Sequence, residues 1–580
     1  MNHHWSLMPV RPVPTARLAA ELGVSPLLAR CLLNRGLDQP GLAASFLQPR
    51  LRHLTDPFRL PNMAAAVDRL FQARENAERL VLFGDFDVDG VTSAALLSEV
   101  LQRLGWNVDV YLPHRFEEGF GLSREGVENC LVKFPTRLLL AVDCGSTATA
   151  TIEWLRQQGV DVVVLDHHQV SNPPPRATAL VNPHLLPPTG PDGGEPDSVF
   201  RDLCSVGLAF KLAHALVKRG REVGLPAALK LDLRPWLDLV ALGTIADLVP
   251  LTGENRILAT AGLNRLNLAE RPGLQALTFV AQTESPVGVS EVAFQLAPRL
   301  NAAGRLEDAQ AALQLLLAAD LATAEPLARE LDSRNRERQK IERAIADEVI
   351  GAVTAKFNAQ TDYVIVEGQL LWHIGVVGIV ASRVVRAFHR PTLILGGDGQ
   401  DWRGSGRSIE GFDLAAALRD CSDLLVRHGG HAMAAGLTLK PEKLDALRDR
   451  LNALARSRLK PEQLQPTLRL DGEVTLGELT LERLEELASL GPHGMGNPPA
   501  HWMTRRLRHQ RPPQRMGKEQ QHAKCWVTDG DASLEAIFWN AGESALPADT
   551  FDLAFEPQIN VFNGRRSVQL KILDWRGARA

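Results

Sequence analysis

Short apolar runs alternate with longer amphipathic stretches between residues 61 and 270. The clearest apolar runs lie at residues 79–83, 108–112, 137–142 and 160–165. Each is brief, continuous and rich in β-prone side chains, as expected of a buried strand. Strands separated by helical stretches are typical of a mostly parallel α/β sheet. Residues 171–200 are rich in Pro and Gly and are predicted to be mostly loop.

The chain before this region is predicted to be a small helical segment, residues 1–60. Residues 15–37 contain two short amphipathic stretches joined by a turn. A helix-turn-helix is one interpretation of this pattern. The interpretation that we favour is a structural clasp on the domain that follows.

After residue 270, the hydrophobic pattern and local composition divide the chain into a connector, a second α/β unit and a β-rich tail. Residues 271–353 are predicted to be a helical connector, because the helix expected at 324–353 has a strongly charged central face. A second, smaller α/β unit is expected at 354–456, followed by a proline-containing linker. The tail, residues 467–580, is β-rich and suits a small barrel.

Composition narrows the class of protein. At 580 residues and 63.4 kDa, the chain should form three or four domains. Its formal charge of −4 argues against a surface of uniformly positive potential, so nucleic-acid binding would need a local groove. Six widely spaced cysteines without a C-x-x-C pair favour free thiols in a reducing compartment. With no apolar leader and no apolar stretch of about 18 residues, we expect a cytoplasmic protein without a membrane contact.

The motif GDFDVDG, residues 84–90, carries three carboxylates on alternate positions, Asp85, Asp87 and Asp89. Carboxylates this close repel one another unless a cation neutralises them. An EF-hand loop is excluded, because its twelfth position would be Leu96 and a strand rather than a helix precedes it. The carboxylates therefore lie between a predicted strand and a predicted helix at 91–105.

Three further stretches place ligand-type residues next to apolar runs. These residues are Asp143, the consecutive Asp166, His167 and His168, and Asp247. Alone, each Asp could be a helix cap and each His a structural residue. Parallel strands, however, would bring all of these stretches to one sheet edge, where ligands bind in such folds. Carboxylates and imidazoles, with Cys144 as the only nearby thiol, favour Mg²⁺ or Mn²⁺. So many carboxylates call for more than one ion, and paired ions ~3.5–4 Å apart typically activate water and stabilise the oxyanions in a phosphoryl displacement.

The motifs DFDVDG, VDCGS, LDHHQ and GTIADLVPL resemble the successive motifs of the DHH phosphoesterase superfamily. Four later stretches resemble the DHH and DHHA1 domains of its bacterial single-strand-specific 5′ exonucleases. They are residues 299–309, 372–383, 404–414 and 428–439. The resemblance covers roughly residues 60 to 445.

This resemblance implies an α/β fold class. A parallel-sheet DHH catalytic domain (61–270) would be joined by a long helix to a smaller α/β DHHA1 domain (354–456). An OB-like, single-strand-binding barrel would follow (467–580). The implied activity is a 5′→3′ exonuclease that releases 5′-mononucleotides from single-stranded DNA in recombination and repair. The implied partners are a helicase and single-strand-binding protein, and the expected state is a monomer.

The resemblance also implies roles for single residues, with two Mg²⁺ or Mn²⁺ ions per active site. The implied metal ligands are Asp85, Asp87, Asp89, Asp143, His167 and Asp247. His168 would lie near the scissile phosphate, as a polarising group or a proton donor. Asp166 would orient a neighbouring side chain. The implied pocket for the 5′ phosphate comprises Arg115, Arg305, Ser405, Arg407 and His431. The glycines beside Ser405 would admit an anion to backbone N–H groups, although turn formation explains them as well.

The barrel region has a locally basic run, residues 504–526, with Trp526 near its end. Cations beside an aromatic surface suit a single-strand path, and a solvated loop is the alternative. Phe538, Trp539 and Phe562 could stack on bases or pack in the core.

Three rival functions fit less well. A haloacid-dehalogenase phosphatase would explain DVDGV at 87–91 but not the Asp-His-His triple. DHH enzymes that hydrolyse nanoRNA, cyclic dinucleotides or pyrophosphate typically lack a basic β-rich tail. A non-catalytic DNA-binding scaffold is disfavoured by the complete set of ligand residues.

Overall fold

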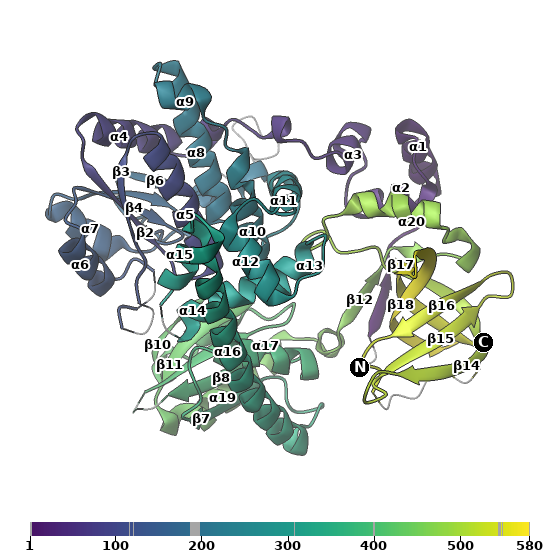
Figure 1. Cartoon of the computed structure of the whole chain (residues 1–580). Helices are drawn as coiled ribbons and strands as arrows, with labels where there is room; N and C mark the ends of the chain where they lie inside the picture. Colours follow the sequence, from purple (N-terminus) through teal and green to yellow (C-terminus); the bar gives the residue numbers. More distant parts are fainter. Residues whose placement is uncertain are drawn as a thin grey trace. The chain divides into compact units, whose positions relative to one another are not determined.

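The computed structural model describes residues 3–114, 117–119, 121–185, 198–306, 308–397, 399, 401–542, 547 and 549–578. The chain forms two compact units (Figure 1). Unit 1 comprises Met1–Leu47, Gln339–Gly491 and Pro499–Ala580, and unit 2 comprises Gln48–Arg338 and Pro492–Pro498. The long helix α16 (Leu321–Lys356) begins in unit 2 and ends in unit 1.

Unit 2 is built on a five-stranded parallel sheet with the strand order β3-β2-β4-β5-β6. The strands are β2 (Arg79–Gly84), β3 (Asn107–Tyr111), β4 (Leu138–Val142), β5 (Asp161–Leu165) and β6 (Ala179–Val181). The four predicted strands and their parallel arrangement are confirmed. Strand β6 is an addition within the segment predicted to be loop, where three residues pair with the edge strand β5.

Helices cover both faces of this sheet (Figure 1). On one face lie α6 (Arg124–Lys133) and α7 (Thr149–Gln157). A larger apolar core forms on the other face. Its helices are α4 (Met63–Glu75), α5 (Val88–Arg103), α8 (Ser205–Glu222), α10 (Leu237–Ala246), α11 (Gly253–Leu266), α12 (Pro272–Ala281), α14 (Ala297–Leu306) and α15 (Gln310–Leu317).

The predicted connector, residues 271–353, is therefore divided differently in the structure. Leu274, Leu300 and Leu331 are buried in the core of unit 2. Residues up to Arg338 belong to that unit, and only the remainder of α16 belongs to unit 1. The charged face of α16 indicated exposure, but apolar side chains on other faces of these helices determine where they pack.

A second sheet, in unit 1, has the order β10-β11-β9-β8-β7. Strands β7 (Ile365–Leu370) and β8 (Thr392–Gly397) are parallel, and the other neighbours are antiparallel. The remaining strands are β9 (Trp402–Arg407), β10 (Leu425–Gly430) and β11 (Ala434–Leu439). Helices α17 (Val377–Phe388), α18 (Leu414–Arg419) and α19 (Leu444–Arg458) complete this α/β domain.

The C-terminal region of unit 1 is a closed barrel. The strands are β14 (Trp502–Met516), β15 (His522–Thr528), β16 (Ser533–Phe538), β17 (Phe551–Phe562) and β18 (Arg565–Gly577). They follow the order β14-β15-β16-β18-β17, and a β14–β17 pairing closes the ring. The predicted OB-like barrel is confirmed. The basic run at 504–526 is mainly the hairpin β14–β15, which excludes the loop interpretation.

The N-terminal helices α1 (Pro12–Leu22), α2 (Pro26–Asn34) and α3 (Pro40–Leu47) pack on this barrel region. Leu28 and Leu32 share an apolar core with Trp502 and Phe551. Strand β1 (His4–Leu7) pairs in parallel with β12 (Thr467–Leu470). The expectation that residues 15–37 clasp the domain that follows is wrong, because an amphipathic stripe does not specify which apolar surface covers it. The end of the predicted N-terminal segment, by contrast, packs on unit 2, through Leu51, Leu54, Phe58 and Leu60.

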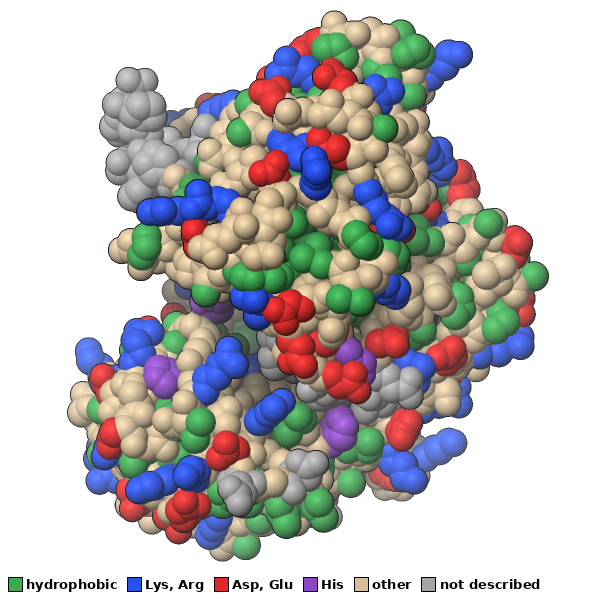
Figure 2. Space-filling view, turned by 90° about the vertical axis from the view of Figure 1, so that its left-hand side faces the viewer, with side chains coloured by type: hydrophobic (Ala, Val, Ile, Leu, Met, Phe, Trp, Pro, Cys, Tyr) green, Lys and Arg blue, Asp and Glu red, His purple; other side chains and the backbone are tan. Residues whose placement is uncertain are grey.

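All six cysteines are buried and none forms a disulfide. Among the described residues, we find no helix with the length and apolarity needed to span a bilayer. On the face shown in Figure 2, Lys and Arg side chains are interspersed with Asp and Glu.

Candidate metal centre

The DFDVDG motif forms the junction between β2 and α5. The Asp87 carboxylate accepts a hydrogen bond from the Gly90 N–H (3.1 Å) and caps α5 at its N-terminus. This cap starts the helix at Val88, three positions earlier than the sequence suggests, and places Asp89 in its buried first turn. A Cβ at position 90 would lie 2.5 Å from the Asp85 carbonyl oxygen, so this turn requires glycine.

The N-terminus of α8 holds two of the carboxylates. The backbone N–H groups of Ser205 and Val206 donate to the two oxygens of Asp89, each at 2.7 Å. The Ser205 hydroxyl donates to Asp143 at 2.8 Å. Negative charge is stabilised at a helix N-terminus, which explains how buried carboxylates are tolerated here.

Asp143 directly follows β4 at the carboxyl edge of the sheet. It is buried, and its backbone is left-handed (φ 63°), which is strained for a non-glycine residue. Its N–H donates to the Leu165 carbonyl (3.0 Å) at the end of the neighbouring strand β5. This bond fixes Asp143 against the strand that leads to the Asp-His-His triple.

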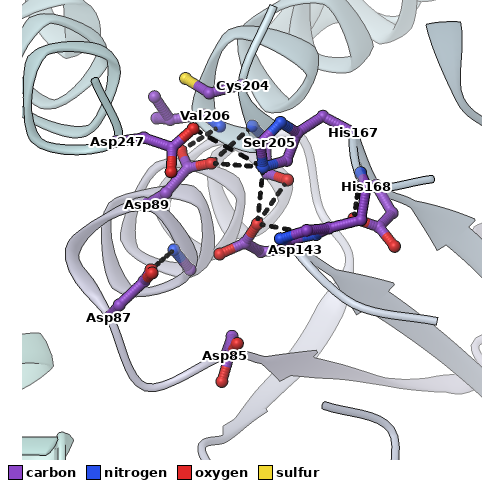
Figure 3. Close-up of polar contacts among 12 residues, drawn as sticks. Asp85, Asp87, Asp89, Asp143, His167, His168, Cys204, Ser205, Val206 and Asp247 are labelled. Carbon is purple, nitrogen blue, oxygen red and sulfur yellow. Dashed lines mark hydrogen bonds and ion pairs between the residues drawn. The ribbon is translucent and has the colours of Figure 1, made fainter. Parts of the chain in front are cut away.

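His167 lies among three carboxylates (Figure 3). Its Nε2 is 3.6 Å from an oxygen of Asp143, 3.6 Å from one of Asp247 and 3.8 Å from one of Asp89. The Nε2 atom is buried and makes no hydrogen bond. Burial and the nearby positive charge of His168 lower the pKa of His167 to about 4, so its imidazole is neutral and can ligate a metal.

Burial is the main cause of the raised pKa values of the carboxylates, and their mutual repulsion adds to it. Burial and the charges of Asp89 and Asp87 raise the pKa of Asp247 to about 9. Burial and Asp87 raise the pKa of Asp89 to about 7, and burial with Asp89 raises that of Asp143 well above its ordinary value. Bound divalent cations would offset both the burial of the carboxylates and their mutual repulsion. The orphaned His167 nitrogen and these carboxylates therefore fit a metal centre.

His168 and Asp166 form a separate ion pair beside this cluster. The Nδ1 of His168 is 2.8 Å from Asp166, which also accepts the Ser146 N–H at 3.0 Å. Burial opposes protonation of His168, but the hydrogen bond and charge of Asp166 raise its pKa to about 9. Burial would raise the pKa of Asp166, yet the interactions with His168 hold it below its ordinary value. His168 is consequently an oriented, positively charged group with 46% of its side chain exposed.

Asp85 lies on the other side of Asp143 from Asp89 and Asp247 (Figure 3). Its carboxylate accepts the Phe86 N–H at 2.7 Å, and its charge contributes to the raised pKa of Asp143. The other five predicted ligands thus lie around Asp143, with Asp85 set apart from the rest.

Sequence reasoning missed Cys204, because it considered only Cys144 as a nearby thiol. Ligand atoms of Cys204, Asp89 and Asp247 lie within 4.8 Å of one another. Burial raises the pKa of the Cys204 thiol well above its ordinary value, so it is protonated. Ser205 was missed as well. The only sequence signal for these two residues is that a helix begins soon after the Pro/Gly-rich segment. That signal does not show which residues the start of the helix contacts.

Helix α14 lies against the DFDVDG loop. Asn301 accepts the Val88 N–H at 3.1 Å, and a Cβ at Gly304 would lie 2.8 Å from the Phe86 carbonyl oxygen. The predicted Arg305 is the next residue of this helix and is half-buried. Asn301 and Gly304 were not predicted, because their contacts depend on the packing of α14.

Unit 1 brings two predicted residues together. On β9, the Arg407 guanidinium donates to the Ser405 hydroxyl at 2.9 Å. Both contact the start of α17, where a Cβ at Gly378 would lie 2.9 Å from the Ser405 hydroxyl. Arg407 is half-buried, and none of the described carboxylates pairs with it. His431 is exposed in the turn between β10 and β11. Arg115 lies outside the described residues.

Comparison with protein families gives three successive matches. Residues 79–244 match the N-terminal domain of the DHH family, residues 360–457 the DHHA1 domain, and residues 470–574 the RecJ OB domain. These spans coincide with the parallel sheet of unit 2, the second sheet and the barrel.

Similar proteins extend over nearly the whole chain. The single-stranded-DNA-specific exonuclease RecJ of Bacillus subtilis is 38% identical over 565 residues, covering 96% of this chain and 69% of the relative. The Escherichia coli protein of the same name is 36% identical, covering 96% of both chains.

Solved structures agree with these matches. The crystal structure of RecJ from Thermus thermophilus in complex with Mn²⁺ superposes with a TM-score of 0.84 at 31% identity, covering 100% of this chain and 80% of that one. The complex with Mg²⁺ gives a TM-score of 0.78 at 29% identity, covering 100% and 79%. In fold, domain order and sequence alike, this chain belongs to the RecJ family of the DHH superfamily.

Proposed function

We propose that this chain is a metal-dependent exonuclease specific for single-stranded DNA, which acts in recombination and repair and removes nucleotides from the 5′ end. The observation that carries the proposal is the buried His167 Nε2, which has no hydrogen bond and lies 3.6–3.8 Å from three carboxylates. The relatives from Bacillus subtilis and Escherichia coli are named single-stranded-DNA-specific exonucleases, which supports the choice of substrate.

The proposed ligands of two Mg²⁺ or Mn²⁺ ions are Asp85, Asp87, Asp89, Asp143, His167 and Asp247. Asp143 is the candidate to serve both ions, since the other carboxylates surround it. When bound, paired divalent ions activate water and stabilise the oxyanions of a phosphodiester displacement. The start of α8 orients Asp89 and Asp143 through the bonds from Ser205 and Val206.

His168 is the proposed group for the scissile phosphate. Its ring is held by Asp166 through Nδ1, which leaves Nε2 to donate to a phosphoryl oxygen or to the leaving group. Asp166 is accordingly a positioning residue. Its own oxygens are occupied by His168 and by the Ser146 N–H.

Ser405 and Arg407 are the proposed receptors for the 5′ phosphate, with Arg305, Arg115 and His431 as further candidates. A half-buried guanidinium that pairs with none of the described carboxylates, beside a hydroxyl and a helix start, is suited to an anion. Recognition of a terminal phosphate would set the 5′→3′ polarity and the release of 5′-mononucleotides.

The barrel is the proposed platform for the rest of the strand. The Arg511 guanidinium lies 4.5 Å from the centroid of the Trp526 ring, on neighbouring strands. Trp539 and Phe562 are exposed and could stack on bases, whereas Phe538 packs against the barrel core. A cytoplasmic location, a monomeric state, and contacts with a helicase and single-strand-binding protein stay predictions.

An end-labelling experiment tests the proposal. A single strand labelled at its 5′ end should lose the label as a mononucleotide with Mg²⁺ or Mn²⁺, whereas a 3′ label should persist until late. Chelator or Asp143→Ala should abolish hydrolysis, and blunt duplex should be spared. Early release of the 3′ label would contradict the polarity, and full activity of Asp143→Ala would contradict the site.

A further inference from the structure

A short segment near the C-terminus, Pro492–Pro498, belongs to unit 2, although the chain on both sides of it belongs to unit 1. The polypeptide therefore leaves unit 1 after Gly491, joins the unit that carries the metal centre, and is again part of unit 1 from Pro499, three residues before β14 begins at Trp502. We refer to Pro492–Pro498 as the docking segment.

The docking segment binds residues shortly after Asp247. The Met495 carbonyl accepts the Leu251 N–H at 2.8 Å. A Cβ at Gly496 would lie 2.9 Å from the Cβ of Pro250, and one at Gly494 would lie 2.7 Å from a methyl carbon of Leu251. The contact is close enough that both positions exclude larger residues.

The docking segment is also internally fixed. Gly494 and Asn497 exchange backbone hydrogen bonds of 3.0 and 3.1 Å. The Asn497 side chain is fully buried and donates to the Pro492 carbonyl at 2.9 Å. Gly496 has a left-handed backbone (φ 70°), which glycine adopts without strain. The segment thus presents a preformed turn to Pro250 and Leu251.

Asp247 needs such support because of its place in the fold. It is the C-cap that directly follows α10, and helix ends fray unless the following residues are held. The next residue, Leu248, has a left-handed backbone (φ 61°) and a 61% exposed side chain, so its own packing contributes little. The residues after it are held from one side by Asn255, which donates to the Pro250 carbonyl at 3.0 Å, and from the other by the docking segment.

We infer that the docking segment is a positioning element for the metal centre: by clamping Pro250 and Leu251 it fixes the Asp247 carboxylate where a divalent ion needs it. This inference rests on the proposed function, in which Asp247 is a metal ligand. It makes the polypeptide that leads into the barrel a structural part of the ion-binding site. Groups that orient metal ligands typically change metal affinity about 10- to 100-fold when they are removed.

The test is Gly496→Ala, in which the new methyl group meets Pro250. The matched control is Gly224→Ala, which has nearly the same backbone (φ 73°) in unit 2 but has no neighbouring atom within 4 Å of the new Cβ. Mn²⁺ binding to the DNA-free protein is measured by the electron paramagnetic resonance signal of free Mn²⁺. We expect Gly496→Ala to weaken Mn²⁺ binding at least about tenfold relative to Gly224→Ala.

A second variant, Asn497→Ala, loosens the turn without adding atoms and should weaken Mn²⁺ binding in the same direction. Single-strand binding without metal should be unchanged in all variants. If both variants bind Mn²⁺ as tightly as the control, the inference is wrong. If the wild-type protein binds Mn²⁺ but degrades no single strand, the proposed function fails, whereas the effect of the docking segment on Mn²⁺ can still be measured.

Discussion

At the scale of single residues, the metal centre gathers like charges that repel one another in the absence of a cation. Asp89 and Asp143 are buried and Asp247 is half-buried, and the pKa of each is raised by burial and by other carboxylates. The folded protein therefore pays a free-energy penalty at this site that binding of divalent ions would remove.

This penalty predicts how stability depends on pH. Since the pKa of Asp247 is about 9 in the folded state and near its ordinary value when unfolded, the folded state keeps a proton that the unfolded state releases. Stability of the metal-free protein should consequently fall as pH rises from about 5 to about 9. Asp247→Asn removes this loss, so its melting temperature in chelator should exceed that of wild type by a margin that widens with pH.

Thermal unfolding at pH 6 and pH 8.5 would measure this margin, with the exposed Asp38→Asn as the control. Added Mn²⁺ should raise the melting temperature of the wild type more than that of Asp247→Asn. A difference in melting temperature that stays constant with pH would show that folding does not raise the pKa of Asp247.

The sequence alone indicated the candidate ligands because each lies at a strand end in a parallel sheet or in a short motif. It could not identify Ser205, Cys204 or Asn301, which reach the site from helices α8 and α14. The residues that a helix end contacts depend on how that helix packs, and no local pattern encodes this packing.

At the scale of elements, β9 and α17 create the proposed anion pocket. Arg407 and Ser405 are two residues apart on β9 and therefore lie on the same face of the sheet. The start of α17 packs on that face at Gly378. Backbone N–H groups at a helix start and a guanidinium thus come from separate elements of one domain.

Arg407→Ala should accordingly reduce the preference for a 5′-phosphorylated strand over a 5′-hydroxyl strand. Loss of a charge-assisted hydrogen bond costs about 1.5–3 kcal/mol, which corresponds to roughly 10- to 150-fold in kcat/KM for the phosphorylated strand. The control is Arg386→Ala, at the other end of α17, where the side chain is exposed. Equal losses on both substrates would exclude a role in recognising the terminal phosphate.

Strand periodicity predicted the main elements, but their boundaries and partners needed the structure. The run at 79–83 was recognisable because both of its faces are buried and apolar. Strand β6 was not recognisable, because three residues in a Pro-rich segment are too few to show a hydrophobic periodicity. Residues 271–338 were assigned to a connector because the charged face of α16 dominates its sequence, whereas their burial follows from tertiary packing.

At the scale of the whole molecule, the barrel core is completed by the other end of the chain. Leu28 is 1% exposed and belongs to the same apolar core as Trp502 and Phe551. The Ser25 N–H donates to Glu486 at 2.7 Å, and the Asn34 amide donates to the Asp471 carboxylate at 3.0 Å. No pattern in residues 1–60 could have indicated this partner, which lies more than 430 residues away in sequence.

Leu28→Ala should therefore destabilise the barrel region by about 2–5 kcal/mol, the usual cost of a buried leucine truncation. Leu42→Ala, in the same segment but 53% exposed, is the control and should change stability little. Denaturant unfolding followed by tryptophan fluorescence reports the effect, because Trp502 lies in this core. A Leu28→Ala protein as stable as the control would show that the N-terminal helices do not support the barrel.

The shared core also has a consequence for biosynthesis. Helices α1 to α3 leave the ribosome long before strands β14 to β18 exist, and at about 5–20 residues per second the delay is tens of seconds. During that interval the apolar side of α2 has no native surface to cover it. A nascent chain of this architecture has to shield its first helices, through a chaperone or a transient contact, until the last hundred or so residues have been translated.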